Sequence, residues 1–150
     1  MIKSNYCRER INKMGKVLDL DTGRVINMES DYFVEGTKHM LKDNYKQVFY
    51  YYKQGDEAGC DNCQLALGVM YFKGHTVEQD YEKAVELWVK SSKQGNSEAI
   101  YRLAQAYDNG WGVKRDYEKG QQLFKKAYEQ GYEFAKFWID ENFNDYYSKK

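Results

Sequence analysis

Two adjacent stretches decide the fold: residues 61–96, DNCQLALGVMYFKGHTVEQDYEKAVELWVKSSKQGN, and residues 97–132, SEAIYRLAQAYDNGWGVKRDYEKGQQLFKKAYEQGY. Aligned without a gap at an offset of 36, they share 12 identical residues, whereas unrelated stretches of this length would share about two. The identical pairs are Leu67/Leu103, Tyr71/Tyr107, Gly74/Gly110, Val77/Val113, Asp80/Asp116, Tyr81/Tyr117, Glu82/Glu118, Lys83/Lys119, Leu87/Leu123, Lys90/Lys126, Gln94/Gln130 and Gly95/Gly131.

Each of these two units is predicted to form a pair of antiparallel helices. In the second unit Ala99, Leu103 and Tyr107 recur every four residues, which places them on one face of a helix. Asp116 follows a glycine-containing loop and is expected to cap the second helix, because an aspartate side chain accepts hydrogen bonds from the free amides of a first turn. Gly131 is expected to end that helix. The first unit follows the same plan.

The rest of the chain is read outward from this core. Residues 133–150 are predicted to form a capping helix that covers the open end of the stack, as repeat arrays require. Residues 30–60 are predicted to form a degenerate helical unit, in which Gly55 ends the second helix as Gly95 does in the next unit. Residues 1–29 form an N-terminal extension, in which the hydrophobic runs on either side of Gly23 predict a short β-hairpin.

The shared pattern resembles the Sel1-like repeat, a relative of the tetratricopeptide repeat. The residues that carry the resemblance in the second unit are Leu103, Tyr107, Gly110, Gly112, Val113, Asp116, Tyr117, Lys119, Gln130 and Gly131. The resemblance implies an all-α protein, an α/α solenoid of helix-turn-helix repeats with a right-handed superhelix. It also implies a concave face that binds other proteins, as in bacterial scaffolds, adaptors, secreted effectors and toxin neutralisers. Thr76 and Gly120 depart from the pattern, which has glycine and alanine there.

Composition excludes several classes of protein. Lys plus Arg and Asp plus Glu both number 23, so the formal charge is zero, which argues against nucleic acid or an anionic membrane as partner. The longest apolar run, residues 65–72, is far too short to span a membrane. No secretory signal is visible in residues 1–30. The three cysteines form no disulfide framework, so a cytoplasmic location is expected.

Two motifs suggest chemistry, and both have a simpler explanation. Asp21-Thr22-Gly23 is similar to the catalytic triplet of aspartic proteases, but beside a helical array a hairpin turn is the favoured interpretation. Cys60 and Cys63 form a C-x-x-C motif at a predicted helix start, where a thiol could be reactive. Because Cys63 aligns with the small residue Ala99, packing is favoured over a redox or zinc site.

The sequence therefore predicts a protein that is not an enzyme and needs no cofactor or metal. His39 and His75 have no acid or nucleophile paired with them in the sequence, and no Ser–His–Asp arrangement is visible. Two alternatives stay open. One is an enzyme, either a C-x-x-C redox protein or a hydrolase like the cysteine-rich repeat relatives. The other is a structural protein that self-associates through its aromatic C-terminal helix.

Helical geometry predicts which residues would line the concave face if the first helix of each unit forms it. The predicted partner-binding residues, together with one loop tryptophan, are Val69, Phe72, Tyr101, Arg102, Gln105, Phe137, Trp138 and Trp111. The alternative is that the first unit's residues pack on residues 1–41, that Phe137 and Trp138 seal the stack, and that Trp111 covers its own repeat. The expected partner is one dedicated protein, either a toxin or effector that the chain neutralises as an immunity protein or inhibitor, or a regulator that it tethers as an adaptor.

Overall fold

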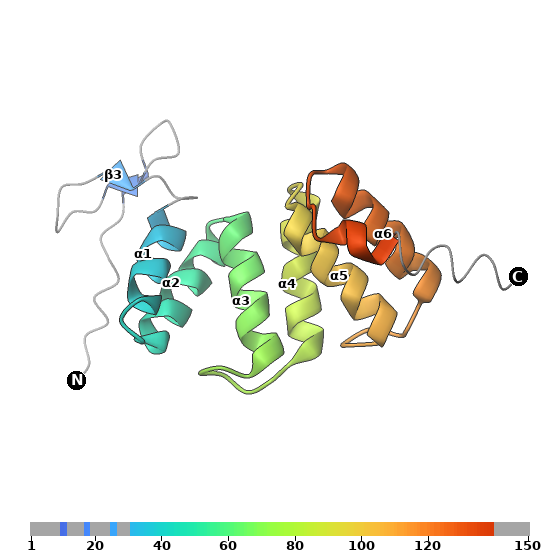
Figure 1. Ribbon diagram of the computed structural model, residues 1–150. Coiled ribbons are helices and arrows are strands. Elements are labelled where there is room, and N and C mark those ends of the chain that lie inside the picture. Colours follow the sequence, from blue (N-terminus) through green and yellow to red (C-terminus); the bar gives the residue numbers. More distant parts are fainter. Residues whose placement is uncertain (1–9, 12–16, 19–24, 27–30, 140–150) are drawn as a thin grey trace, which may run out of the picture.

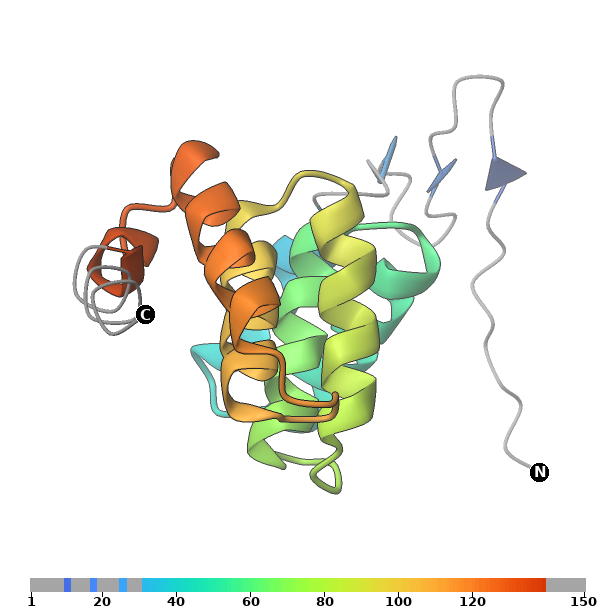
Figure 2. The same cartoon turned by 90° about the vertical axis from the view of Figure 1, so that its right-hand side faces the viewer.

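The computed structural model describes residues 31–139 and three short strands before them, at 10–11, 17–18 and 25–26. Its helices follow one another in a row along the molecule (Figure 1). They are α1 Asp31–Met40, α2 Tyr45–Glu57, α3 Asp61–Lys73, α4 Tyr81–Lys93, α5 Ser97–Asn109 and α6 Tyr117–Glu129. Viewed from the C-terminal end, α6 lies in front and earlier helices stack behind it (Figure 2). The predicted all-α, α/α solenoid is confirmed.

Each helix pair is held by local signals that the sequence repeats. The side chains of Asp80 and Asp116 accept hydrogen bonds from the backbone amides of Lys83 and Lys119, at 2.9 and 3.0 Å, and so cap α4 and α6. Helices α3 and α5 end at glycines in the left-handed conformation, which needs no Cβ to be accommodated. The packed pairs are α1 with α2, α3 with α4, and α5 with α6.

The N-terminal unit follows the repeat more closely than the sequence suggested. Helix α2 runs on to Glu57, and the residue with positive φ that follows it is Gly59, at φ 84°. At an offset of 36 this residue matches Gly95, whose φ is 90°. The prediction that Gly55 ends the helix was therefore wrong. Gly55 lies inside α2 and is buried. The Cys63 side chain of α3 packs so closely against it that a Cβ at this position would collide with that side chain.

The two departures from the repeat pattern have different structural settings. Thr76 adopts a φ of 72°, close to the 66° of Gly112, so the first loop takes its turn without the glycine. Left-handed backbone is strained for a β-branched residue. Gly120 lies at the buried position that Ala84 occupies in α4, where a Cβ would meet the Ala104 carbonyl oxygen at 3.2 Å.

The strands before α1 form a small antiparallel sheet. Strands β1 Arg10–Ile11, β2 Val17–Leu18 and β3 Val25–Ile26 lie in the order β1-β2-β3. Val17 pairs with Ile26 and Leu18 with Val25, so the two strands of the predicted hairpin are paired. Strand β1 was not predicted. The turn between β2 and β3, which contains Asp21 and Gly23, lies outside the described residues.

The predicted C-terminal cap is described at its start. Residues 135–139 are helical, and Ala135 is fully buried against the last repeat. The indole ring of Trp138 stacks on Phe124 of α6, with ring centroids 5.1 Å apart and the planes 3° from parallel. This contact closes the apolar end of the stack. The remainder of the predicted cap, residues 140–150, lies outside the described residues.

Candidate functional site

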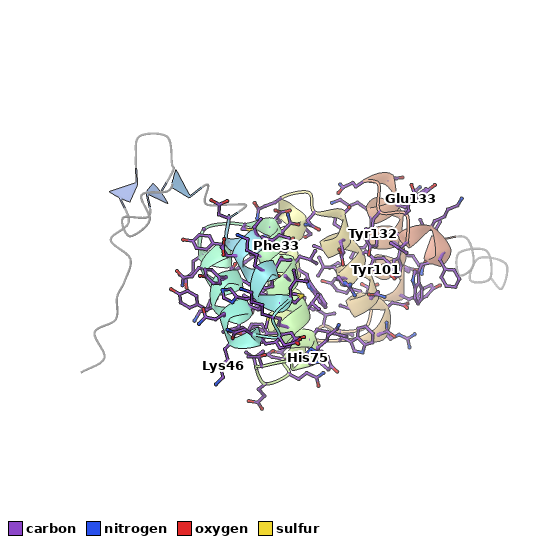
Figure 3. All side chains as sticks on the ribbon, turned by 60° about the vertical axis from the view of Figure 1, so that its left-hand side comes forward. Phe33, Lys46, His75, Tyr101, Tyr132 and Glu133 are labelled. Carbon is purple, nitrogen blue, oxygen red and sulfur yellow. The ribbon has the colours of Figure 1, made fainter. Side chains whose placement is uncertain are left out.

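A groove of about 530 Å³ runs along the face built by the first helices of the units, α1, α3 and α5. Figure 3 shows two of its residues, Phe33 and His75, on the N-terminal half of the solenoid. Residues of α2 close the groove at the end beside α1. The lining comprises Phe33, Thr37, Met40, Tyr45, Val48, Tyr52, Asn62, Leu65, Ala66, Val69, Met70, Lys73, His75, Glu98 and Arg102.

The floor of the groove is apolar because helical spacing brings one face of α3 onto it. Val69 lies three residues after Ala66 and four after Leu65, so the three side chains share that face. Phe33 and Met40 extend the apolar surface from α1. Leu65 and Val69 also pack against the core between α3 and α4. The floor is therefore held in place by the fold itself.

Polar groups gather at the edges of this apolar floor. Arg102 donates a hydrogen bond to the Glu98 carboxylate at 2.9 Å, and both side chains are about one-third exposed. Its Nε is buried and has no acceptor among the described residues. Lys73, at the other end of the α3 face, makes no ion pair within the described part of the chain. The edge thus carries hydrogen-bond donors that the protein itself leaves unused.

Of the predicted partner-binding residues, Val69 and Arg102 line the groove. Tyr101 and Gln105 lie on α5 beside Arg102 but are tied into the C-terminal end of the stack. The Tyr101 hydroxyl accepts hydrogen bonds from Gln105 Nε2 at 3.1 Å and from Trp138 Nε1 at 3.2 Å. Its ring centroid lies 4.9 Å from that of Tyr132; Figure 3 labels both residues. Tyr101 is half-buried and is not among the residues that line the groove, and its part in partner binding stays a prediction.

Phe72 and Trp111 meet each other instead of facing the groove. Their ring centroids are 5.0 Å apart, and Phe72 also contacts Trp88 at 5.6 Å and Tyr81 at 5.2 Å. Trp111 therefore packs across the joint onto Phe72 of the preceding repeat, against a cluster that also contains Leu103 and Ala106 of its own repeat. Both rings are half-buried. Their place in the fold is the seam between the two repeats.

Phe137 and Trp138 have separate roles although they are adjacent. Trp138 seals the stack against Phe124, as one of the sequence alternatives anticipated. Phe137 keeps 57% of its surface exposed, and its neighbour Phe134 keeps 75%. Neither phenylalanine lines the groove.

Several groove residues were missed by sequence reasoning, chiefly Phe33, Met40, Tyr45 and His75. The first three belong to the N-terminal unit. The sequence analysis aligned Gly55 of this unit with Gly95, which shifted the unit by four residues relative to the repeat. The signal that could have found them is the match of Gly59 with Gly95, which restores the offset of 36. His75 follows Gly74 in the loop after α3 and is exposed at the groove edge.

The C-x-x-C pair is structural in this arrangement. The backbone amide of Cys63 donates to Cys60 Sγ at 3.2 Å, so Cys60 caps α3 as Asn96 caps α5. A hydrogen bond from the Cys63 thiol lowers the pKa of Cys60, while that same bond and burial raise the pKa of Cys63. Both are free thiols, 1% and 0% exposed, so substrates cannot reach the sulfur atoms in the folded state.

Neither histidine of the described region forms a catalytic pair. His39 stacks on Tyr51, with ring centroids 5.3 Å apart, and His75 lies at the groove edge. Within the described residues no three His, Cys, Asp or Glu side chains gather as a metal site would require. No helix in this part of the chain is both long and apolar enough to cross a membrane.

Comparison with known proteins agrees with this architecture. The family model "Sel1 repeat" matches residues 61–96 and 97–132. No curated protein is similar enough in sequence to count as a match. Among solved structures, a Sel1 repeat protein from Oxalobacter formigenes is 25% identical, with a TM-score of 0.70, over 77% of this chain and 89% of that chain.

Two further structures are similar. A protective antigen of uropathogenic Escherichia coli strains, which displays an SLR fold, is 30% identical over 69% of this chain, with a TM-score of 0.66. This chain spans 23% of that antigen's length. Helicobacter pylori cysteine-rich protein B is 26% identical over 61% of this chain and 69% of its own, with a TM-score of 0.59.

Sel1 repeats are typical of modules that bind other proteins, and they are generally not enzymes. The family model, the repeat period and the solved structures all point to the same unit of two helices. Residues 61–132 of this chain belong to the Sel1 repeat family.

Proposed function

We propose that this chain is a non-enzymatic module that binds one dedicated protein partner in the groove formed by α1, α3 and α5. The single observation that carries the proposal is the apolar floor of the groove, about 530 Å³ in volume and built from residues that the core already holds in place. A preformed apolar hollow with a few polar groups at its edge is the usual form of a recognition site.

The partner is a toxin or effector that the chain neutralises, or a regulator that it tethers. Among the described residues the groove extends over α1, α3 and α5, and a site of this length suits one partner segment at a time. We place the chain in the cytoplasm, because Cys60 and Cys63 are both free thiols, as is usual in reducing compartments.

Filling the groove tests the proposal. Ala66 lies on the groove floor at the position that Arg102 occupies in α5, so the fold already accepts arginine at this site in a repeat. Ala66→Arg is expected to abolish capture of the partner by the tagged chain in cells of the source organism. Gln122→Arg adds the same charge at an exposed site on α6 outside the groove and is expected to leave capture unchanged.

The melting temperatures of both variants should match that of the parent chain. If the Ala66→Arg variant is folded and still captures the same partner, the groove is not the binding site.

The exposed phenylalanines favour a second candidate, self-association through the C-terminal end. Phe134 and Phe137 are 75% and 57% exposed, and large apolar side chains in the open tend to mark contact surfaces. Sedimentation velocity over a range of concentrations tests it. A dimer that dissociates into monomers in the Phe137→Glu variant would support this function. A monomer at every concentration would contradict it.

A further inference from the structure

We propose that the segment bound in the groove is acidic as well as apolar, with carboxylates that pair with Lys73 and Arg102. This inference rests on the proposed function and adds the chemistry of the partner. Its occupant is a short stretch of a partner protein in which Asp or Glu residues stand beside aliphatic or aromatic ones.

The charges on the groove wall support an acidic occupant. Among its lining residues the basic side chains are Lys73 and Arg102, joined by the titratable His75, and the acidic one is Glu98. The pair between Glu98 and Arg102 cancels one charge of each sign. Lys73 then leaves the groove with an excess positive charge, although the chain as a whole is neutral. A local excess of one sign on a neutral protein selects the opposite sign in a partner.

Unused donors give the carboxylates a place to bind. Arg102 uses its guanidinium on Glu98 alone, and its Nε is buried with no acceptor among the described residues. A guanidinium has five N–H donors and binds carboxylates in a fork. The Arg102 side chain is about one-third exposed, so N–H groups of its guanidinium beyond the one bound to Glu98 can donate charge-assisted hydrogen bonds to an incoming carboxylate.

The two cations stand at different levels of the groove, with apolar surface between them. Arg102 occupies in α5 the position of Ala66 in α3, and Lys73 lies seven residues further along α3. At 1.5 Å per residue this separation is about 10 Å along the helix axis. Val69 lies between these levels on the apolar floor. A bound segment therefore meets charge, apolar surface and charge in turn.

The experiment uses a phage-displayed library of random peptides selected on the full chain. Clones that lose binding on Ala66→Trp, which fills the groove floor without adding a charge, are taken as groove binders. They are expected to be enriched in Asp and Glu next to apolar residues. Lys73→Glu should weaken these clones by about tenfold or more, the effect of a lost charge-assisted hydrogen bond. Lys93→Glu is the matched control, because Lys93 is the last residue of α4 as Lys73 is of α3.

The outcomes separate this inference from the function on which it rests. Groove binders without acidic residues, or acidic binders that ignore Lys73→Glu, would overturn the acidic partner and leave the groove as a binding site. A selection with no clone sensitive to Ala66→Trp would count against the groove itself. Equal losses on Lys73→Glu and Lys93→Glu would mean a general charge effect, and the inference would fail.

Discussion

The indole of Trp88 lies against the backbone of Gly68, and its ring nitrogen donates a hydrogen bond to the Leu65 carbonyl oxygen at 3.3 Å. A Cβ at position 68 would stand 2.5 Å from that nitrogen and 2.7 Å from the neighbouring ring carbon. Trp88 is 2% exposed. The contact between α3 and α4 therefore depends on the absence of a side chain at Gly68.

Gly68→Ala should consequently destabilise the protein. Overpacking of a buried contact costs about 2 kcal/mol, more than the gain of about 1 kcal/mol from replacing a helical glycine. Urea unfolding followed by circular dichroism measures the change. Gly120→Ala is the milder comparison, because a Cβ there would meet the Ala104 carbonyl oxygen at 3.2 Å and the Asp108 nitrogen at 3.3 Å, and it should cost clearly less than Gly68→Ala. Equal stability of the two variants would contradict the packing described.

Thr76→Gly should stabilise the protein by about 1 kcal/mol. Thr76 is held at a φ of 72°, a conformation that costs a non-glycine residue about 1–2 kcal/mol, and part of the gain is offset by the greater freedom of glycine in the unfolded chain. The melting temperature reports the change. Thr76→Ala keeps a Cβ and should recover little of the gain, and a gain as large from alanine would refute the strain.

Trp138→Ala should lower the free energy of unfolding by about 2 kcal/mol, because it removes the stacking on Phe124 and the hydrogen bond to Tyr101. Phe137→Ala, the adjacent and exposed aromatic, should cost less than about 0.5 kcal/mol. Chemical denaturation of both variants makes the comparison. Similar losses from the two substitutions would show that Trp138 does not close the stack.

Asp108→Asn should raise stability at pH 7, by about 0.5 kcal/mol after solvent screening, because the side chain is only half-buried. Burial raises the pKa of Asp108, and Arg115 partly opposes it. A raised folded-state pKa favours the neutral acid, so the penalty is absent below the unfolded pKa and appears as pH rises through the folded pKa. The gain should therefore vanish near pH 3, about one unit below the usual value for aspartate.

Thermal melts at pH 7 and pH 3 test this dependence. Asp116→Asn is the control, since Asp116 caps α6 and asparagine keeps an oxygen acceptor there. That variant should change stability little at either pH. A gain for Asp108→Asn that persists unchanged at pH 3 would contradict the proposed cause.

Cys60 and Cys63 should resist Ellman's reagent in the native protein, because their side chains are almost completely buried. A Cys7→Ser background removes the third thiol of the chain. Labelling should then follow the rate of opening and become rapid only in denaturant. Rapid labelling of the native protein would reopen the redox interpretation.

The repeat let the sequence predict most of the fold, because capping aspartates and terminal glycines act locally. Asp80, Asp116 and Gly131 were all placed correctly by their neighbours in the chain. Gly55 was misassigned because the sequence alone does not distinguish a glycine needed for close packing from a glycine that ends a helix. The choice between them depends on Cys63, a residue of another helix.

The candidate site was harder to predict, because helical periodicity shows which residues share a face of a helix but does not show which other residues pack on that face. Arg102 and Val69 were found on that basis. Tyr101 lies on the same helical face, but its hydroxyl accepts a hydrogen bond from Trp138, a residue that follows the second repeat in the chain. Phe33 and Met40 come from a unit whose first helix carries none of the repeat's signature residues.

Gly59, Gly95 and Gly131 share nearly one backbone angle, with φ of 84°, 90° and 91°, and open space where a Cβ would be. Because these three glycines have nearly the same φ, the backbone turns in a similar way after α2, α4 and α6. Duplicating a block of 36 residues between two such glycines would lengthen the groove by one repeat and keep the path of the backbone. The length of the groove is thus set in steps of one repeat, and lengthening it requires no new kind of turn.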